Sequence, residues 1–499
     1  MKELKMIVRN SGFFPILQTL GVLLSLWLLL SCASVSPNPV INSLRFPNLE
    51  GLSEKQSGAH LVETYSFRGS DVDFGTILVP ENRNKPESRL IHLPFLRYRS
   101  KSETPLDPVF YLHGGPGLPN AEGNTFLAGL FQDAHDVVFV GYRGIDGKTN
   151  LLTLNLFNRM TELMKKREPI SPEDLKQLAQ AFKQDCEAWK EKGIDVEGYN
   201  TIEVVDDMDA VRTALGYEKI NLFGQSYGSR LAYYYSLRYP KQVNRVVQQG
   251  INPPGRFYWG KDHLQRVFEL YNKLWKLDGE ATKLSPDLYT TWKNVLLRLP
   301  ITVKGTEITR EYLASMVHGA LYNVSDAPMV FKLLLSAEKG DFTPLVDIMI
   351  QASKKGGTGG INADSLLKIA TSDYDPAIDY LADFLEKHPG TISYATLPWA
   401  TLSEDPTWIK TIPQEYRTWS NTDVQTLLIN GTLDPSTPSW DLEEYASHYK
   451  NGKLILVRER SHSDIYSAAP SVWKELFLTY FRTGKFDETQ VPYIKAKLY

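Results

Sequence analysis

The sequence is poor in cysteine. Only Cys32 and Cys186 occur among its 499 residues, which is too few for a zinc site or a disulfide framework. We expect Cys186 to be a small packed side chain, since a free cysteine commonly behaves as a hydrophobe.

A strong charge of either sign is also missing. The formal net charge is −3 at pH 7 and no long basic run occurs, so the chain has no electrostatic field that would gather nucleic acid. We therefore expect no nucleic-acid partner. The chain is long, however, and exceeds the roughly 250–300 residues at which a single core stops growing. This length predicts one large core with an inserted or appended domain.

A cluster of metal ligands is not evident either. Asp206, Asp207 and Asp209 lie close together, but on a helix they share no face with a histidine or cysteine. We expect them to form a solvated or capping surface. The sequence accordingly predicts no metal and no cofactor.

The N-terminus resembles an export signal. Basic residues precede a long apolar run that ends at Cys32, and this order is typical of a secretion signal. Leu29-Leu30-Ser31-Cys32 resembles a bacterial lipobox, in which the cysteine is acylated. We expect residues 1–31 to be a lipoprotein-type signal peptide, Cys32 to carry the lipid, residues 32–61 to be a linker, and the protein to be exported and anchored to the membrane of the cell envelope. The alternative is an uncleaved membrane anchor, for which the run is barely long enough.

Residues 62–255 alternate between strand-like and helix-like segments. "DFGTILVP" and "RLIHLPFLRY" predict two antiparallel strands, whereas "PVFYL", "DVVFV" and "INLFG" are apolar on both faces, as buried strands of a parallel sheet are. "SPEDLKQLAQAFKQDCEAWK" opens with a capping box and predicts a helix. This alternation predicts an α/β protein with a mostly parallel, doubly wound sheet.

The pattern changes between residues 256 and 400. Long amphipathic stretches rich in aromatic residues occur there without clear strand signals, which predicts a helical insert. Strand character returns within residues 401–499, in "TLLING" and "KLILV". We therefore expect residues 62–255 and 401–499 to form one core that is interrupted by a helical domain.

The segment Gly224-Gln225-Ser226-Tyr227-Gly228 fits the pattern G-x-S-x-G between a predicted strand and a predicted helix. In this context the glycines allow a sharp turn that leaves the serine hydroxyl exposed as a nucleophile. The alternative is a serine that only caps the following helix. The position between strand and helix favours the nucleophile.

A serine nucleophile needs a base and a group that orients the base. In this kind of fold the acid and then the histidine follow the serine, each in a loop after a late strand. Asp434 follows "TLLING" and His462 follows "LILVRE", so we expect them to complete a catalytic triad with Ser226. Asp464 is a rival acid, although it lies only two residues from the histidine.

Acyl transfer also needs donors for the developing oxyanion, usually two backbone N–H groups. The glycine-rich "HGGPG", residues 113–117, directly follows an early strand. We expect one donor from this loop, at Gly115, and the other from Tyr227. His113 is expected to organise the loop and not to act as a base.

Together these motifs resemble the prolyl aminopeptidase and tripeptidyl aminopeptidase family of α/β-hydrolases. The resemblance rests on "HGGPG", "YRG", the block around Ser226, and "GTLDPSTP" followed by "SH". It implies an α/β-hydrolase fold, a triad of Ser226, Asp434 and His462, an oxyanion donor at Gly115, and an inserted helical cap that selects the free amino end of a substrate.

The chain departs from the family pattern at two positions. Gly141 replaces an aspartate before x-R-G, and Ser461 replaces the usual glycine before the histidine. Both positions border the expected site. The carboxylates of the insert, Glu269, Glu307 and Glu311 among them, cannot be ranked as ligands of a substrate amine from the sequence.

The sequence therefore predicts an exported serine hydrolase that acts on a small peptide or ester substrate through an acyl-enzyme, most simply an aminopeptidase that releases N-terminal residues or short peptides. A carboxylesterase of the same fold is the nearest alternative. A lipoprotein that binds a ligand without using the triad is a third, and the presence of all three residues in order argues against it.

Overall fold

The computed structural model describes residues 47, 49, 56–67, 70–121, 123–151, 154–166, 170–354, 366–386, 388 and 393–499. The expected signal peptide, residues 1–31, and the expected lipidation site Cys32 lie outside the described residues. None of the described helices has both the length and the hydropathy needed to cross a membrane.

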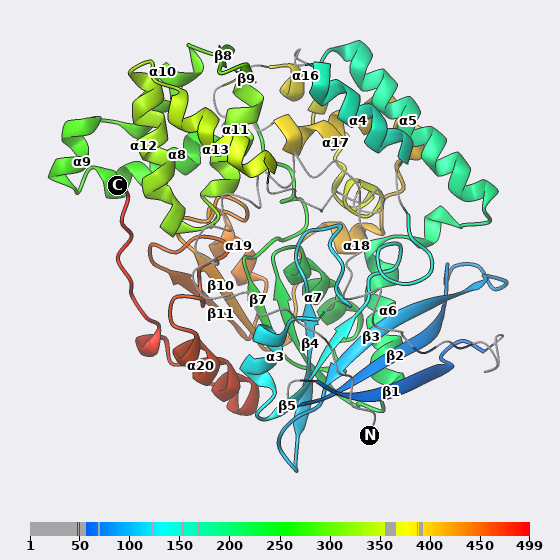
Figure 1. The fold of residues 1–499 in the computed structure, drawn as a ribbon. Coiled ribbons are helices and arrows are strands. Elements are labelled where there is room, and N and C mark those ends of the chain that lie inside the picture. Colours follow the sequence, from blue (N-terminus) through cyan, green and yellow to red (C-terminus); the bar gives the residue numbers. More distant parts are fainter. Residues whose placement is uncertain are drawn as a thin grey trace.

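A twisted sheet forms the centre of the described chain (Figure 1). Its nine strands lie in the order β1-β2-β3-β5-β4-β6-β7-β10-β11. β1, β2, β3 and β5 pair antiparallel in that order, and all pairs from β5 to β11 are parallel. The strands are β1 (His60–Phe67), β2 (Ser70–Pro80), β3 (Leu90–Tyr98), β4 (Leu106–Leu112), β5 (His135–Val140), β6 (Ile220–Gln225), β7 (Val243–Gln249), β10 (Thr426–Gly431) and β11 (Gly452–Val457). The predicted α/β class and the mostly parallel sheet are confirmed.

Helices cover both faces of this sheet because its central strands are apolar on both sides. In β4, Phe110 and Leu112 belong to one hydrophobic cluster, and Val109 and Tyr111 belong to the cluster on the opposite face, as the two-residue period of a strand requires. The first cluster is closed by α6 (Thr201–Ala214), α7 (Tyr227–Arg238) and α19 (Leu442–Ser447). The second is closed by α3 (Thr125–Phe131) and α20 (Pro470–Thr483).

The predicted helical insert lies between β7 and β10 and forms a cap above the sheet in Figure 1. Its main part has a hydrophobic core of its own, in which Trp275, Trp292 and Phe331 are almost completely buried. The cap helices are α8 (His263–Trp275), α9 (Gly279–Leu284), α10 (Leu288–Leu296), α11 (Arg310–Ala320), α12 (Ala327–Glu338), α13 (Thr343–Lys354), α15 (Thr371–Asp373), α16 (Tyr380–Leu385) and α17 (Ser393–Glu404), with short turns η2 (Val324–Asp326) and η3 (Leu366–Ala370). Outside the cap lie η1 (Val196–Gly198), η4 (Pro406–Trp408), α18 (Gln414–Arg417) and η5 (Glu488–Gln490).

The expectation that the insert has no strands is wrong. A short hairpin, β8 (Ile301–Val303) with β9 (Thr306–Ile308), joins α10 to α11. Its two loop residues, Lys304 and Gly305, both have positive φ, at 50° and 74°, which suits the tight turns that connect such strands. The run of β-branched residues on both sides of "KG" is the signal for this hairpin.

Two helices that precede the insert also join the helical layer. α4 (Leu154–Lys166) and α5 (Pro172–Glu191) pack side by side beside α17 (Figure 1). The predicted capping box of α5, between Ser171 and Asp174, is present. The apolar face of α5 shares a cluster with Leu397 and Ala400 of the cap, because the sheet faces are already covered by other helices. Cys186 is buried in this cluster, and burial raises the pKa of its thiol to about 12.

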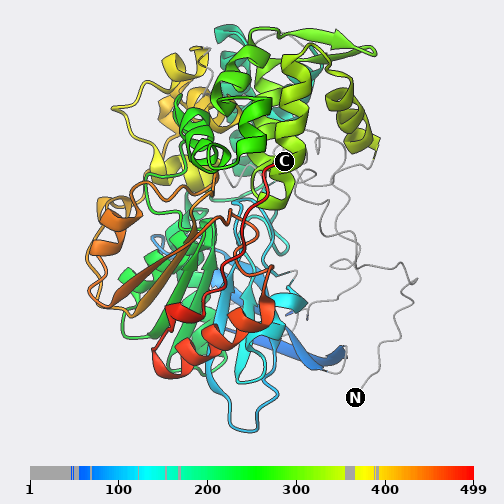
Figure 2. The same cartoon turned by 90° about the vertical axis from the view of Figure 1, so that its left-hand side faces the viewer.

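The last residues connect the core to the cap. Figure 2 shows this tail, in red, running from α20 along the side of the molecule to the cap. Leu498 is buried in the core of the cap, and the ring of Tyr499 lies 5.8 Å from that of Trp275. On the way, Tyr493 Oη donates to Glu459 Oε1 at 2.8 Å, Ala496 N donates to Glu459 Oε2 at 2.7 Å, and Arg460 Nη2 donates to Ile494 O at 2.6 Å.

The aspartates of α6 do not form the expected solvated surface. Asp207 is fully buried, and its carboxylate accepts hydrogen bonds from Arg143 at 2.6 and 2.7 Å and from Arg83 at 2.8 Å. Burial by itself would raise the pKa of Asp207, but the two guanidinium groups hold it below its usual range. The sequence shows the aspartates of α6, but it does not show which arginines the fold brings to them.

We expect Asp207→Ala to destabilise the fold severely, because it leaves the buried guanidinium of Arg143 without its strongest acceptor. Removing one partner of a buried pair costs about 3–5 kcal/mol. Chemical denaturation followed by near-UV circular dichroism measures the change. Asp133→Ala is the matched control, since Asp133 pairs with Lys101 on the surface and such pairs contribute about 0–1 kcal/mol. Equal midpoints for the two variants would contradict a stabilising role for the buried pair.

Candidate functional site

Ser226 lies at a strained turn between β6 and α7. Its φ is 55° and its ψ is −124°, a backbone conformation that residues other than glycine rarely adopt. The Ser226 side chain makes no capping hydrogen bond to α7. The alternative interpretation, a serine that caps the helix, is therefore wrong.

The two glycines of the motif are required by the close approach of chain segments. A Cβ atom on Gly224 would lie 2.4 Å from Gly228 O, and one on Gly228 would lie 2.0 Å from Leu112 O at the end of β4. Both distances are below any normal contact of a Cβ atom. The motif G-x-S-x-G thus describes a turn that only glycine permits at both ends.

Asp434 and His462 are in direct contact. The His462 Nδ1 atom lies 2.8 Å from Asp434 Oδ2, and Asp434 is fully buried. The carboxylate also accepts hydrogen bonds from the N–H groups of Ser436 and Thr437 and from Thr437 Oγ1, each at 2.8 Å. Because a carboxylate accepts, the Nδ1 atom donates, and the Nε2 atom of the neutral imidazole is left to accept a proton.

The rival acid Asp464 has other partners. It accepts from Ser461 N at 2.7 Å and from Val324 N at 3.2 Å, and it pairs with Arg460 at 3.3 Å. Burial raises the pKa of Asp464, while these donors and Arg460 lower it in part. Among the described residues, Asp434 and not Asp464 is hydrogen-bonded to the His462 ring. Asp464 supports the backbone of the histidine loop instead.

Gln249 and Gly250, at the end of β7, lie between Ser226 and His462. Ser226 N donates to Gln249 O at 2.8 Å, and Gln249 Nε2 donates to His462 O at 3.0 Å. A Cβ atom on Gly250 would lie only 2.9 Å from His462 Cε1. The structure therefore places Ser226, Asp434 and His462 on the same side of the sheet, at the carboxyl ends of its parallel strands.

The "HGGPG" loop lies against the serine. A Cβ atom on Gly114 would lie 2.8 Å from Ser226 Cβ and 3.4 Å from Ser226 Oγ. The next residue, Gly115, has φ +124°, and its N–H makes no hydrogen bond with any residue that the structure describes. Tyr227 begins α7 directly after Ser226. Tyr227 is thus adjacent to the serine in the chain, and Gly115 follows the glycine that contacts it.

His113, at the start of this loop, is hydrogen-bonded to its neighbours. Its Nδ1 lies 3.0 Å from Gly114 O, and burial lowers the pKa of its ring. Its backbone is held from outside the loop, since Tyr142 Oη donates to His113 O at 3.1 Å and His113 N donates to Asn120 Oδ1 at 3.1 Å.

Two supporting residues, Asn120 and Asp146, were not predicted. Asn120 Nδ2 donates to Val140 O at 2.8 Å, while Asp146 Oδ2 accepts from Asn120 N at 2.9 Å and from Tyr142 N at 2.7 Å. A Cβ atom on Gly141 would lie 2.8 Å from Asp146 Cβ. Asp146 therefore fills the space that a side chain at residue 141 would take. The signal for it was present, since the aspartate missing at residue 141 reappears in "GID" five residues later.

The carboxylates named for the insert lie elsewhere. Glu269 is exposed and accepts from Gln265 at 2.9 Å, Glu307 belongs to the β8–β9 hairpin, and Glu311 is in the first turn of α11. Within the described residues, none of the three is hydrogen-bonded to Ser226, Asp434 or His462. No group of three or more potential metal ligands is assembled in the described part of the chain.

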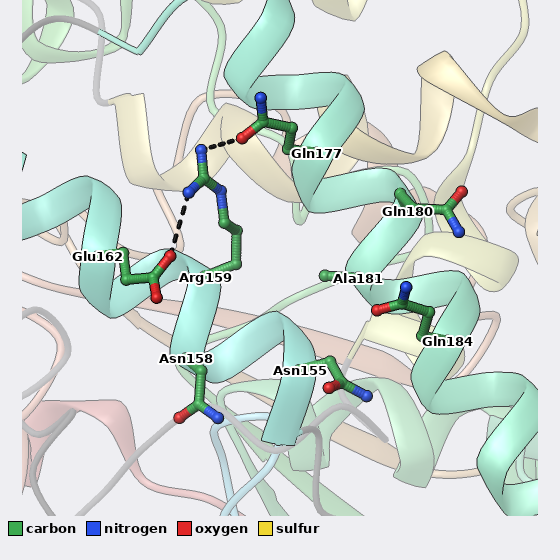
Figure 3. A pocket seen from close by; sticks show the side chains of 8 residues that line it. All are labelled: Asn155, Asn158, Arg159, Glu162, Gln177, Gln180, Ala181 and Gln184. Carbon is green, nitrogen blue, oxygen red and sulfur yellow. Dashed lines mark hydrogen bonds and ion pairs between the residues drawn. The ribbon is translucent and has the colours of Figure 1, made fainter.

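Two hollows among the described residues are lined at least partly by the helical layer. The larger, about 300 Å³, is a polar groove between α4 and α5 (Figure 3), lined by Asn155, Asn158, Arg159, Glu162, Gln177, Gln180, Ala181 and Gln184. None of these residues belongs to the serine site. The smaller, about 50 Å³, lies where the cap meets the core, and Trp259, His263 and Thr437 are among its lining residues. Thr437 places this small cavity beside Asp434.

The chain is an α/β-hydrolase. Residues 107–289 match the model of the alpha/beta hydrolase fold, and this region contains the "HGGPG" loop and Ser226. Residues 401–492 match the model described as TAP-like protein, and this region contains Asp434 and His462. The turn at Ser226 and the buried acid–histidine pair thus lie within the two matched regions.

More particularly, the chain is distantly related to tripeptidyl aminopeptidases. It is 26% identical over 224 residues to the tripeptidyl aminopeptidase of Streptomyces lividans, covering 41% of this chain and 40% of that one. It is 26% identical over 196 residues to the serine protease Hip1 of Mycobacterium tuberculosis, covering 36% of each chain. The matched region thus spans well under half of either relative.

Solved structures resemble the chain with lower sequence identity than these relatives. A serine hydrolase from Cycloclasticus zankles is 10% identical with a TM-score of 0.36, covering 86% of this chain and 100% of that one. An esterase from Exiguobacterium antarcticum is 13% identical with a TM-score of 0.37, covering 81% of this chain and 98% of that one.

We expect Gly250→Ala to slow reaction at the serine sharply, because the added methyl group displaces the His462 ring. A misplacement of about 1 Å in an active site can cost about 100-fold in rate. The rate of labelling by a fluorophosphonate probe measures the effect. Gly255→Ala is the control, since Gly255 also has positive φ, at +77°, but a Cβ atom there meets nothing within 4 Å. Equal labelling rates in the two variants would show that Gly250 does not hold the histidine in place.

Proposed function

We propose that Ser226 is the nucleophile of this hydrolase, His462 its general base and Asp434 the group that orients the base. The observation that carries the proposal is the strained, uncapped serine beside a buried Asp434–His462 pair with a separation of 2.8 Å. In this arrangement His462 Nε2 takes the proton of Ser226 as the hydroxyl attacks an acyl carbon. The carboxylate stabilises the imidazolium that forms, and the imidazolium gives its proton to the amine or alcohol that leaves as the acyl bond breaks. His462 then takes a proton from water, which attacks the acyl-enzyme, and Ser226 regains its proton as the acid is released.

The oxyanion of each tetrahedral intermediate is assigned to the N–H groups of Gly115 and Tyr227. The contact between Gly114 and Ser226 brings the loop within reach of the reacting carbon. Donors that are fixed before reaction stabilise the developing charge without a cost of reorganisation. The hydrogen bond that His113 N donates to Asn120 Oδ1 and the one that His113 O accepts from Tyr142 Oη supply that fixation.

For the substrate, we propose a peptide with a free amino end, from which the enzyme releases N-terminal residues or short peptides. The TAP-like match and the distant similarity to a tripeptidyl aminopeptidase support this choice, as does the helical cap beside the site. A carboxylesterase is the second candidate, because within the described part of the chain Glu269, Glu307 and Glu311 make no hydrogen bond to the three site residues. A protein that only binds a ligand would leave the strained turn at Ser226 without a use.

The two candidates predict opposite responses to blocking the amino end. If buried carboxylates receive the protonated amine, acetylation removes the charge and leaves those carboxylates unpaired, which costs about 2–5 kcal/mol, or roughly 30- to several-thousand-fold in kcat/KM. We expect this loss between a free peptide amide and its N-acetylated form with the same leaving group. A ratio near one, together with fast turnover of simple esters, would favour the esterase.

Ser226→Ala is the control for this measurement. We expect it to remove activity toward every substrate, and labelling by the fluorophosphonate probe, in a folded protein. If Ser226→Ala still labels and turns over substrate, the assignment of the nucleophile is wrong, whatever the preference for free amines.

We also propose that the protein is exported and held at the membrane by a lipid on Cys32. The support is the N-terminal sequence alone, since Cys32 lies outside the described residues. Cys32→Ser should abolish acylation and processing, because the modified thiol carries the lipid that holds the chain at the membrane. Mass analysis of the mature N-terminus tests this. An intact Met1 with an unmodified Cys32 in the wild-type protein would instead support the uncleaved anchor.

A further inference from the structure

Three side chains of the cap donate hydrogen bonds to the loop that carries Asp434. His263 Nε2 lies 2.7 Å and His318 Nε2 3.1 Å from Pro435 O, and Trp259 Nε1 donates to Ser436 O at 2.9 Å. A carbonyl oxygen only accepts, so each imidazole carries its proton on Nε2. Burial lowers the pKa of both rings, that of His263 to about 3. Both histidines are therefore neutral donors, fixed in one tautomer.

The same part of the cap also reaches the loop that carries His462. Ser461 Oγ donates to Leu321 O at 2.6 Å, and Ser463 N donates to Tyr322 O at 2.9 Å. The ring of Tyr322 then lies 5.2 Å from that of His462, edge to face. Ser461 is also the position at which the chain departs from the family pattern. Its hydroxyl makes a bond that a glycine there could not make.

These contacts converge on one helix end. α11 ends at Ala320, so His318 lies in its last turn and Leu321 directly follows it. Through this helix end the cap is hydrogen-bonded to both loops. His318 contacts the loop that carries Asp434, and Leu321 contacts the loop that carries His462. The two loops follow the neighbouring strands β10 and β11. They also contact each other directly, since Leu433 N donates to Arg460 O at 2.9 Å and Ser461 Oγ lies 3.3 Å from Leu433 O. The end of α11 adds a second support that is common to both loops, and it thereby helps to fix the separation of Asp434 and His462.

We propose that the end of α11 is a positioning element of the active site, and that His318 and Ser461 are the residues through which it sets the geometry of Asp434 and His462. The inference rests on the proposed function, because it concerns how the assigned base is aligned. The cap is then more than a cover that selects substrates. It is needed for the chemical step, even with a substrate too small to touch it.

Ser461→Ala and His318→Leu test the proposal in the full chain, with the fluorophosphonate probe and the small ester p-nitrophenyl acetate. We expect each variant to lower the maximal labelling rate and kcat by roughly 10- to 100-fold, as small misplacements in active sites do. The probe concentration for half-maximal rate and KM should change little. His318→Gln should recover most of the loss, because its side-chain amide can place a donor near the position of the His318 Nε2 atom.

Two buried residues away from the loops provide matched controls. Ser315→Ala removes a buried hydroxyl that donates to Glu311 O at 2.8 Å within α11 itself. His135→Leu removes a fully buried histidine whose Nδ1 lies 2.7 Å from Asp107 O in the core. Thermal unfolding first checks that each control loses about as much stability as the test variant it matches. Both controls should then keep wild-type reaction rates.

The outcomes distinguish a failure of this positioning role from a failure of the proposed function. If wild-type protein is not labelled at Ser226, the proposed function fails. If wild type is labelled but Ser461→Ala and His318→Leu react at the rates of their controls, the cap does not position the pair and the inference is overturned. A rise in KM with kcat unchanged would likewise overturn it, since that result assigns both residues to substrate binding.

Discussion

The close contact between the start of α7 and the end of β4 is the constraint on which the site depends. Gly228 approaches Leu112 O so closely that no side chain fits, and the chain can reach this point only if Ser226 takes a positive φ. Backbone strain of this kind costs on the order of 1–3 kcal/mol and persists only where the surroundings enforce it. Here the enforcement comes from the parallel pairing of β6 with β4 and β7.

The same contact explains the position of the other site residues. Because β4 ends beside this turn, the "HGGPG" loop that follows it passes over Ser226, so closely that a Cβ atom on Gly114 would lie 2.8 Å from Ser226 Cβ. Because β7 pairs with β6 on the other side, Gln249 is hydrogen-bonded to both Ser226 N and His462 O, and Gly250 lies against the His462 ring. One steric requirement in the sheet thus arranges three loops around a hydroxyl group.

Much of this arrangement could be predicted from local signals. The strand, turn and helix around Ser226 are encoded by an apolar run and two glycines. The order of the late strands in the sequence is enough to predict Asp434 and His462 as neighbours. What the sequence could not give is the partner of each buried group. Arg143 lies 64 residues from Asp207, and nothing local connects them. The apolar face of α5 was evident from its period, but the residues of the cap that cover it were not, since periodicity shows a buried face without showing what it packs on. Asp146 is visible in the sequence as an aspartate five residues after Gly141, but only the loop geometry shows that it fills the space beside that glycine.

The tail that joins α20 to the cap has a consequence for biosynthesis. Its residues Tyr493, Ile494 and Ala496 bind Glu459 and Arg460, at the start of the loop that carries His462. These residues follow every other part of the site in the chain. The histidine loop therefore cannot complete its contacts until these residues have left the ribosome. The site is assembled last, so a nascent chain carries Ser226 without an aligned His462 until that point.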